Sequence, residues 1–132
     1  MNLSQEREEK TMILKRQGYY KEMPHGDDTD QSIFEYIHKK IDNKDKICNY
    51  LRNGYVLAAC GSVVKDIICP EKGVIGSPDD ITDGTWIWPA DLVYYVENYD
   101  LQLDEEFIKH MAKQSWSVSE DLIIDEDDIE VV

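Results

Sequence analysis

The sequence has no apolar run long enough to span a bilayer, and its first sixteen residues lack the apolar segment of a secretory signal. We therefore expect a cytoplasmic protein that makes no membrane contact. Cysteine is also scarce: Cys48, Cys60 and Cys69 are an odd number of thiols without metal-ligand spacing. Each lies among apolar neighbours, so we expect buried free thiols in a reducing compartment.

Basic residues are few, with 14 Lys and Arg against 28 Asp and Glu, which gives a net charge of −14. The last sixteen residues hold seven acids and no base, so half of this charge lies in the rest of the chain. Such a surface repels nucleic-acid phosphates and attracts a basic partner. We expect no direct nucleic-acid binding, although the same charge also serves solubility alone.

Catalytic motifs are absent as well. The chain has no phosphate-binding glycine loop and no nucleophile elbow, and no histidine has a partner at ligand spacing. Acidic residues at 27–30 and 79–83 offer oxygen ligands for a hard cation, but the spacing of a calcium loop is missing. Aspartate is common in turns, which is the simpler interpretation. We therefore expect no enzyme, no metal and no cofactor.

The alternative is a protein with a catalytic or metal-binding site. Asp66 and Asp83, together with either His25 or His110, are the residues that a small enzyme or metal-binding protein would use. This hypothesis belongs to a different class from a binding module, and removal of metal by a chelator distinguishes the two.

Helical patterns occur twice in the first half of the chain. Ser32 and Glu35 have the spacing of a capping box, which predicts a helix with an apolar face formed by Ile33, Phe34, Ile37 and Ile41. A second helix is predicted to carry Ile47, Tyr50 and Leu51 inward. Gly54 is expected as its C′ residue, because glycine adopts the left-handed conformation at little cost.

The pattern then becomes extended. Two β-rich runs within residues 55–69 flank Gly61-Ser62, which predicts a hairpin with a type II′ turn. Residues 74–76 are a further strand candidate. Asp83-Gly84 predicts a type I′ turn, followed by a strand at residues 85–88.

Two more helices are predicted toward the C-terminus. Pro89 suits the first turn of a helix whose buried stripe contains Leu92, Val93, Val96 and Tyr99. Asp104 is the expected N-cap of the last helix, which buries Phe107, Ile108 and Met111.

The resulting fold class is α+β, because helices and strands are segregated along the chain. We expect one domain over residues 1–116, with an antiparallel sheet, made of the hairpin at 55–69 and the strand at 85–88, packed against about four helices. Residues 1–16 are expected to form a short helix or an edge strand. Residues 117–132 form an acidic tail that either adds an edge strand or is disordered.

A binding surface is the remaining functional signal. Aromatic residues beside acids are typical of protein-binding hot spots that attract a basic partner. Acidic loop residues and the side chains that leave the apolar stripe of the helix at 91–100 are the candidates: Asp27, Asp28, Asp30, Asp79, Asp80, Tyr94, Glu97 and Asn98. Structural roles in the turn, the strand and the helix start are expected for Asp83, Gly84, Trp86, Trp88 and Pro89.

The segment Thr82-Asp83-Gly84-x-Trp86-x-Trp88-Pro89 resembles a motif of small bacterial proteins that are found beside polymorphic, Rhs or contact-dependent toxins and are regarded as immunity proteins. Further matching positions extend the likeness over residues 18–116: Tyr20, Glu22, Gly26, Tyr50, Leu51, Gly54, Val64, Asp66, Gly76, Ser77, Pro78, Leu92, Tyr94, Tyr95, Val96, Tyr99, Leu103, Phe107 and Met111.

This resemblance implies a cytosolic protein that blocks a cognate toxin domain by direct contact and has no catalytic residues of its own. If the toxin is a basic nuclease, acidic side chains of this protein would occupy the place of the phosphate substrate. A third hypothesis treats residues 122–128 as a docking peptide that adds a strand to another protein.

Overall fold

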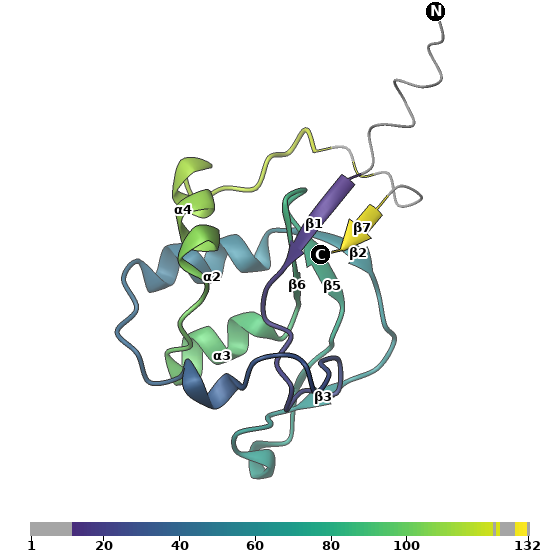
Figure 1. The fold of residues 1–132 in the computed structure, drawn as a ribbon, viewed down its shortest axis with the longest axis vertical. Coiled ribbons are helices and arrows are strands. Elements are labelled where there is room, and N and C mark those ends of the chain that lie inside the picture. The colour runs from purple at the N-terminus through teal and green to yellow at the C-terminus, as the bar shows by residue number, and fades with distance from the viewer. Residues whose placement is uncertain (1–11, 123, 125–128, 132) are drawn as a thin grey trace, which may run out of the picture.

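The computed structural model describes residues 12–122, 124 and 129–131. Within them, a five-stranded sheet has the order β2-β5-β6-β1-β7, and a separate two-stranded sheet pairs β3 with β4. The strands are β1 (Met12–Arg16), β2 (Tyr55–Ala58), β3 (Val64–Lys65), β4 (Val74–Gly76), β5 (Asp80–Thr82), β6 (Trp86–Pro89) and β7 (Ile129–Val131). Three α-helices gather on one side of the larger sheet (Figure 1).

The three helices are α2 (Lys44–Arg52), α3 (Leu92–Tyr99) and α4 (Glu105–Lys113). The prediction for α2 is confirmed, with Ile47, Tyr50 and Leu51 buried. For α4 the Asp104 cap is confirmed, since its side chain accepts a hydrogen bond from the N–H of Glu106 at 2.9 Å. Phe107 and Met111 are buried as predicted, whereas Ile108 is half-buried. The sequence therefore predicts the positions of amphipathic helices that have a clear apolar stripe.

The α+β class is correct, but the predicted purely antiparallel sheet and the count of about four helices are wrong. β1 pairs in parallel with both β6 and β7, so the sheet is mixed. β1 also lies inside the sheet and not at its edge, while Ile129–Val131 forms the edge strand, one of the two outcomes considered for the acidic tail. Residues 1–11, 123, 125–128 and 132, which include most of residues 122–128, lie outside the described residues.

The predicted helix after Ser32 is wrong. Only a 3-10 turn, η1 (Ile33–Glu35), forms there, and Phe34 is 53% exposed. Ser32 caps this turn, but Glu22 and not Glu35 completes the cap by accepting hydrogen bonds from the Ser32 hydroxyl and the Ile33 N–H. His38 then adopts a positive φ of 58° and donates its N–H to the carbonyl of Tyr99. Long-range pairing with the end of α3 thus replaces further helical turns.

The predicted hairpin at residues 55–69 is also wrong. β2 pairs antiparallel with β5, whereas β3 pairs with β4 in the other sheet. Gly61 has a positive φ of 63°, as expected of a turn glycine, but the chain continues from there into β3 of the two-stranded sheet and does not fold back onto β2. A second 3-10 turn, η2 (Pro70–Lys72), separates β3 from β4.

The turn at Asp83-Gly84 does connect a hairpin, formed by β5 and β6. Only Gly84 has a positive φ, of 94°, so the turn is not type I′. Pro89 is the last residue of β6, paired with Asp80, and does not begin a helix. α3 starts three residues later, with Leu92, Tyr95, Val96 and Tyr99 buried.

Gly54 has a different role from the predicted one, because it does not adopt the left-handed conformation. A Cβ atom there would lie 2.4 Å from Ile81 Cγ2 and 2.8 Å from Trp88 Cζ2. Glycine therefore allows the chain to pass from α2 to β2 in contact with the core.

Aromatic side chains fill the space between the sheet and α4. Phe107 is fully buried and stacks on Trp86 with ring centroids 4.8 Å apart, while Trp88 lies 5.3 Å away. The indole N–H of Trp88 donates to the carbonyl of Leu51 at 3.1 Å, which joins β6 to α2. Satisfying this buried donor fixes the helix layer against the sheet.

Candidate functional site

The two acidic loop segments predicted from the sequence meet at one place. The Arg16 guanidinium donates to both carboxylate oxygens of Asp30, at 3.2 and 3.3 Å. It also lies over the ring of Tyr19, 4.7 Å from the ring centroid. The hydroxyl of Tyr19 in turn donates to Asp80 Oδ1 at 2.8 Å. Arg16 and Tyr19 thus connect acids that are fifty residues apart in the sequence.

Next to this chain of contacts is a hollow of about 420 Å³, which we call the Tyr19 hollow. Its walls include Arg16, Tyr19, His25, Cys60, Val63 and Asp80. Val63 is 66% exposed and gives the rim an apolar part. The hollow therefore combines an apolar rim with the carboxylate of Asp80, the aromatic ring of Tyr19 and a guanidinium that is paired with Asp30.

His25 is held at the wall of the hollow by the buried carboxylate of Asp91, whose oxygens lie 3.2 and 3.3 Å from Nε2. The Tyr19 ring meets the imidazole edge-on, with centroids 5.6 Å apart. Nδ1 is enclosed and has no hydrogen-bond partner among the described residues. Asp91 thus engages Nε2 of His25, while Nδ1 is enclosed.

The other acids of these segments mostly stabilise their own loops. Asp27 Oδ1 accepts hydrogen bonds from the N–H and the hydroxyl of Thr29, which hold the pKa of Asp27 below its usual value and keep it charged. Asp79 Oδ1 accepts from the N–H of Cys60 at 2.9 Å, and Asp28 is exposed. These aspartates therefore stabilise their turns and also contribute negative charge to the surface.

The predicted binding residues on α3 lie elsewhere. Tyr94 is half-buried and donates its hydroxyl to Asp66 at 2.7 Å. Glu97 forms an ion pair with Arg52 at 2.5 Å, and Asn98 donates to the carbonyl of Tyr94. None of the three α3 side chains lines the Tyr19 hollow, so the structure does not unite them with the acidic loops.

Asp66 is fully buried and forms a network of its own. Its oxygens accept hydrogen bonds from the hydroxyls of Tyr94 and Tyr99 and from the N–H groups of Ile68 and Cys69. Burial raises the pKa of Asp66, but these four hydrogen bonds together outweigh it, so the pKa lies below its ordinary value. Burial and the bond to Asp66 raise the pKa of Tyr99 to about 12.

Asp83 forms a third, separate network. Its Oδ1 accepts from the N–H groups of Thr85 and Trp86, which fixes the hairpin turn. Its Oδ2 accepts from the hydroxyl of Tyr50 at 2.5 Å and lies 3.2 Å from His110 Nε2. Asp66, Asp83 and His25 therefore belong to three different networks. Within the described part of the chain, no three His, Cys, Asp or Glu side chains are arranged to hold a metal ion.

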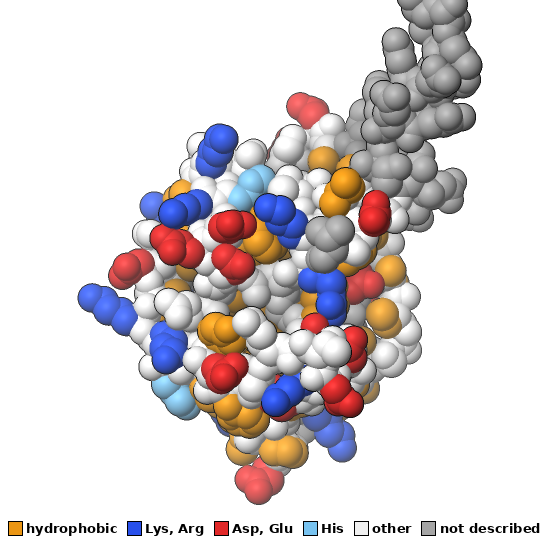
Figure 2. Space-filling view, in the orientation of Figure 1, with side chains coloured by type: hydrophobic (Ala, Val, Ile, Leu, Met, Phe, Trp, Pro, Cys, Tyr) orange, Lys and Arg blue, Asp and Glu red, His pale blue; other side chains and the backbone are white. Residues whose placement is uncertain are grey.

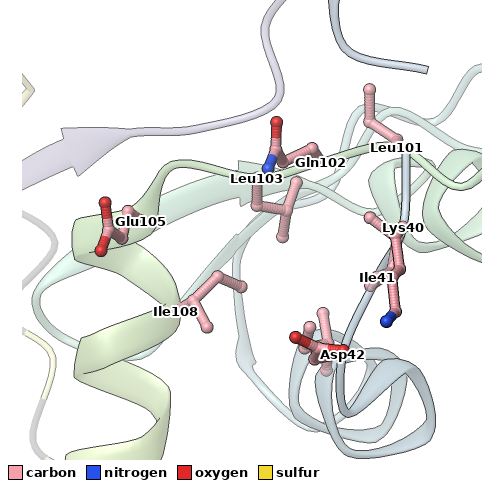
Figure 3. A pocket seen from close by; sticks show the side chains of 9 residues that line it. Lys40, Ile41, Asp42, Leu101, Gln102, Leu103, Glu105 and Ile108 are labelled. Atoms are coloured by element: carbon pink, nitrogen blue, oxygen red, sulfur yellow. The ribbon is translucent and has the colours of Figure 1, made fainter. Parts of the chain in front are cut away.

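A second hollow, of about 270 Å³, lies between the start of α4 and the segment before α2 (Figure 3). Leu103 and Ile108 point into it, and Asp42 and Glu105 stand on opposite sides of it. The second hollow shows no comparable convergence of predicted residues.

The surface in Figure 2 carries acidic and basic side chains close together, so the excess of acids is not concentrated on that face.

Sequence reasoning did not select Arg16, Tyr19 or Asp91. Their roles depend on contacts across 14, 61 and 66 residues, respectively, and no local pattern marks them. The aromatic content of the loop around Tyr19 was the one usable signal.

Comparison with known proteins finds no matching family model, no matching curated protein and no matching solved structure. None of the helices in the described residues has the length and apolar character needed to cross a membrane.

Proposed function

We propose that this protein is an immunity-type protein of the bacterial cytoplasm that neutralises a cognate toxin domain by binding it, without catalysing a reaction. The observation that carries the proposal is the link between Asp30 and Asp80 through Arg16 and Tyr19, beside the Tyr19 hollow. The resemblance of the Thr-Asp-Gly-x-Trp-x-Trp-Pro segment to immunity-type proteins supports the same conclusion.

Charge explains how such a protein would act. The chain has a net charge of −14, Asp80 lines a hollow that has an apolar rim, and Arg16 holds Asp30 next to it. A nuclease toxin must present a basic surface to bind phosphates, and that surface would be attracted to these carboxylates. The protein would then cover the site where the nucleic acid binds, and direct nucleic-acid binding by the protein itself is not part of the proposal.

The test uses a purified toxin C-terminal domain, which the resemblance implies is encoded beside this protein's gene, and follows its association and dissociation by surface plasmon resonance. The informative variant is Asp79→Asn combined with Asp80→Asn, because asparagine Oδ1 still accepts the hydrogen bonds from Cys60 and Tyr19 while the charges are removed. We expect at least tenfold slower association at low salt and a smaller change in dissociation.

The matched control is Asp42→Asn combined with Asp45→Asn, which removes the same charge beside the second hollow and the start of α2. We expect this control to keep most of the association rate. Absence of binding by the wild-type protein contradicts the proposed function, and equal effects of the two double variants contradict the assignment of the Tyr19 hollow.

A further inference from the structure

One stretch of the chain has no charged side chain. Residues 53–64 contain no Asp, Glu, Lys or Arg, although such residues make up 32% of the whole chain. Residues 58–63 of this stretch are all exposed, and Val56 and Val63 are 59% and 66% exposed. Burial of all three cysteines was therefore wrongly predicted, because Cys48 is buried but Cys60 is exposed and Cys69 is half-buried. An exposed segment without charge in a strongly acidic protein is typical of the centre of an interaction surface.

This stretch contains a sheet edge. β2 is the terminal strand of the five-stranded sheet, and in the described residues it pairs only with β5. Natural proteins usually protect such an edge with lysine or proline, because its backbone groups can pair with another strand. Residues 55–58 contain neither, and their side chains are Tyr, Val, Leu and Ala.

The apolar side chain of Val56 extends the core beyond its covered part. Val56 is directly opposite Ile81, which is opposite Trp88, so the three side chains lie on one face of the sheet. Ile81 and Trp88 are buried, whereas Val56 is exposed at the end of this row. An added strand would cover Val56 and continue the row.

Acids flank the edge at both ends. Where β2 ends, Ala58 is opposite Asp80, and Asp79 accepts the hydrogen bond from the N–H of Cys60. Where β2 begins, the hydroxyl of Tyr55 donates to the carbonyls of Ser119 and Glu120, which places the exposed acidic segment at 120–121 nearby. The pattern along the edge is therefore acidic, uncharged, acidic.

We propose that β2 is the docking edge for an extended segment of the cognate toxin, with an uncharged, apolar centre and basic residues at both ends. Backbone hydrogen bonds to β2 provide the pairing, and the flanking acids select the basic ends. A second copy of this chain fits less well, because an antiparallel β2–β2 contact would bring the acidic ends of the two copies together. The inference rests on the proposed function.

The test compares two lysine substitutions at valines of nearly equal exposure. Val56→Lys adds a positive charge to the β2 edge, and Val74→Lys adds the same charge to β4 of the other sheet, where Val74 is 57% exposed. We expect Val56→Lys to weaken binding of the toxin domain at least tenfold and Val74→Lys to change it less than twofold. Both variants should keep the wild-type thermal midpoint.

Hydrogen exchange of the complex tests strand addition itself. The amides of residues 55–58 that point away from β5 should gain at least tenfold protection when the toxin domain binds, whereas the amides of the opposite edge, 129–131, should not. If the toxin domain binds wild-type protein but Val56→Lys binds equally well and the β2 amides gain no protection, the docking edge is wrong and the proposed function stands. If the wild-type protein does not bind it, both fall.

Discussion

His110 Nε2 lies 3.2 Å from Asp83 Oδ2, and this contact ties α4 to the turn between β5 and β6. The same carboxylate accepts the hydroxyl of Tyr50 from α2 and two N–H groups of the turn. Its side chain is only 1% exposed. The aspartate of the Thr-Asp-Gly-x-Trp-x-Trp-Pro segment therefore acts as a structural centre that holds two helices and a hairpin together.

Replacing Asp83 tests this role. Asp83→Asn keeps the shape of the side chain but replaces one carboxylate oxygen with an amide NH₂. The NH₂ group cannot accept a hydrogen bond, whether it stands where Tyr50 and His110 approach or where the turn N–H groups donate. We expect the free energy of unfolding in urea to fall by about 3 kcal/mol. The same substitution at exposed Asp28 should cost less than about 0.5 kcal/mol. Equal, small losses at both positions would contradict the structural role.

The two phenylalanines of the chain give a second matched pair. Phe107 is fully buried between Trp86 and Trp88, whereas Phe34 is 53% exposed. Phe107→Ala should lower the unfolding free energy by about 4 kcal/mol, because it leaves a cavity in the aromatic core. Phe34→Ala should cost less than about 1 kcal/mol. A comparable loss at Phe34 would show that its turn is packed more closely than the structure indicates.

Alanine substitutions at Gly54 and Gly61 distinguish the stability cost of close packing from that of backbone strain. In Gly54→Ala the new methyl group would lie 2.4 Å from Ile81 Cγ2, which requires the core to move and should cost about 3 kcal/mol. In Gly61→Ala nothing lies within 4 Å of the new methyl group, but the φ of 63° is unfavourable and should cost about 1 kcal/mol. Thermal and urea unfolding measure both values. A smaller loss at position 54 would contradict the packing account.

Local patterns predicted the elements that local interactions determine. α2 and α4 followed from apolar periodicity and the Asp104 cap, and the β5–β6 turn followed from Asp83-Gly84. The helix after Ser32 failed because Glu22, ten residues earlier, completes the cap of a short turn, and His38 then pairs with Tyr99. The prediction of strand pairing failed for a similar reason, because nothing in residues 55–69 shows that β2 pairs with β5.

The candidate site was predictable only in part. Acidic segments at 27–30 and 79–80 were visible in the sequence as charge, but their proximity depends on Arg16 and Tyr19. Tyr94 was expected on a binding surface because it leaves the apolar stripe of its helix. The structure instead directs its hydroxyl to a buried carboxylate from another element, Asp66. Buried polar networks of this kind are not encoded by periodicity.

Asp66 should give the protein a specific acid sensitivity. Its pKa in the folded protein lies below the ordinary value of about 4, so its contribution to stability is present above about pH 4 and is lost as the pH falls through the folded-state pKa. Asp66→Asn should cost about 2 kcal/mol at pH 7, and the difference from wild type should shrink toward pH 3. Urea unfolding at both pH values measures it, and a difference that stays constant would contradict the low pKa.

The central claim is that this protein neutralises a toxin by stoichiometric contact. The most direct measurement is the activity of a toxin domain that the resemblance implies is encoded beside its gene, titrated with this protein at low salt. We expect the activity to fall linearly to zero at one equivalent. We also expect Asp79→Asn with Asp80→Asn to slow the onset of inhibition, whereas Asp42→Asn with Asp45→Asn should not. Toxin activity that is unchanged at a tenfold molar excess of this protein would contradict the account.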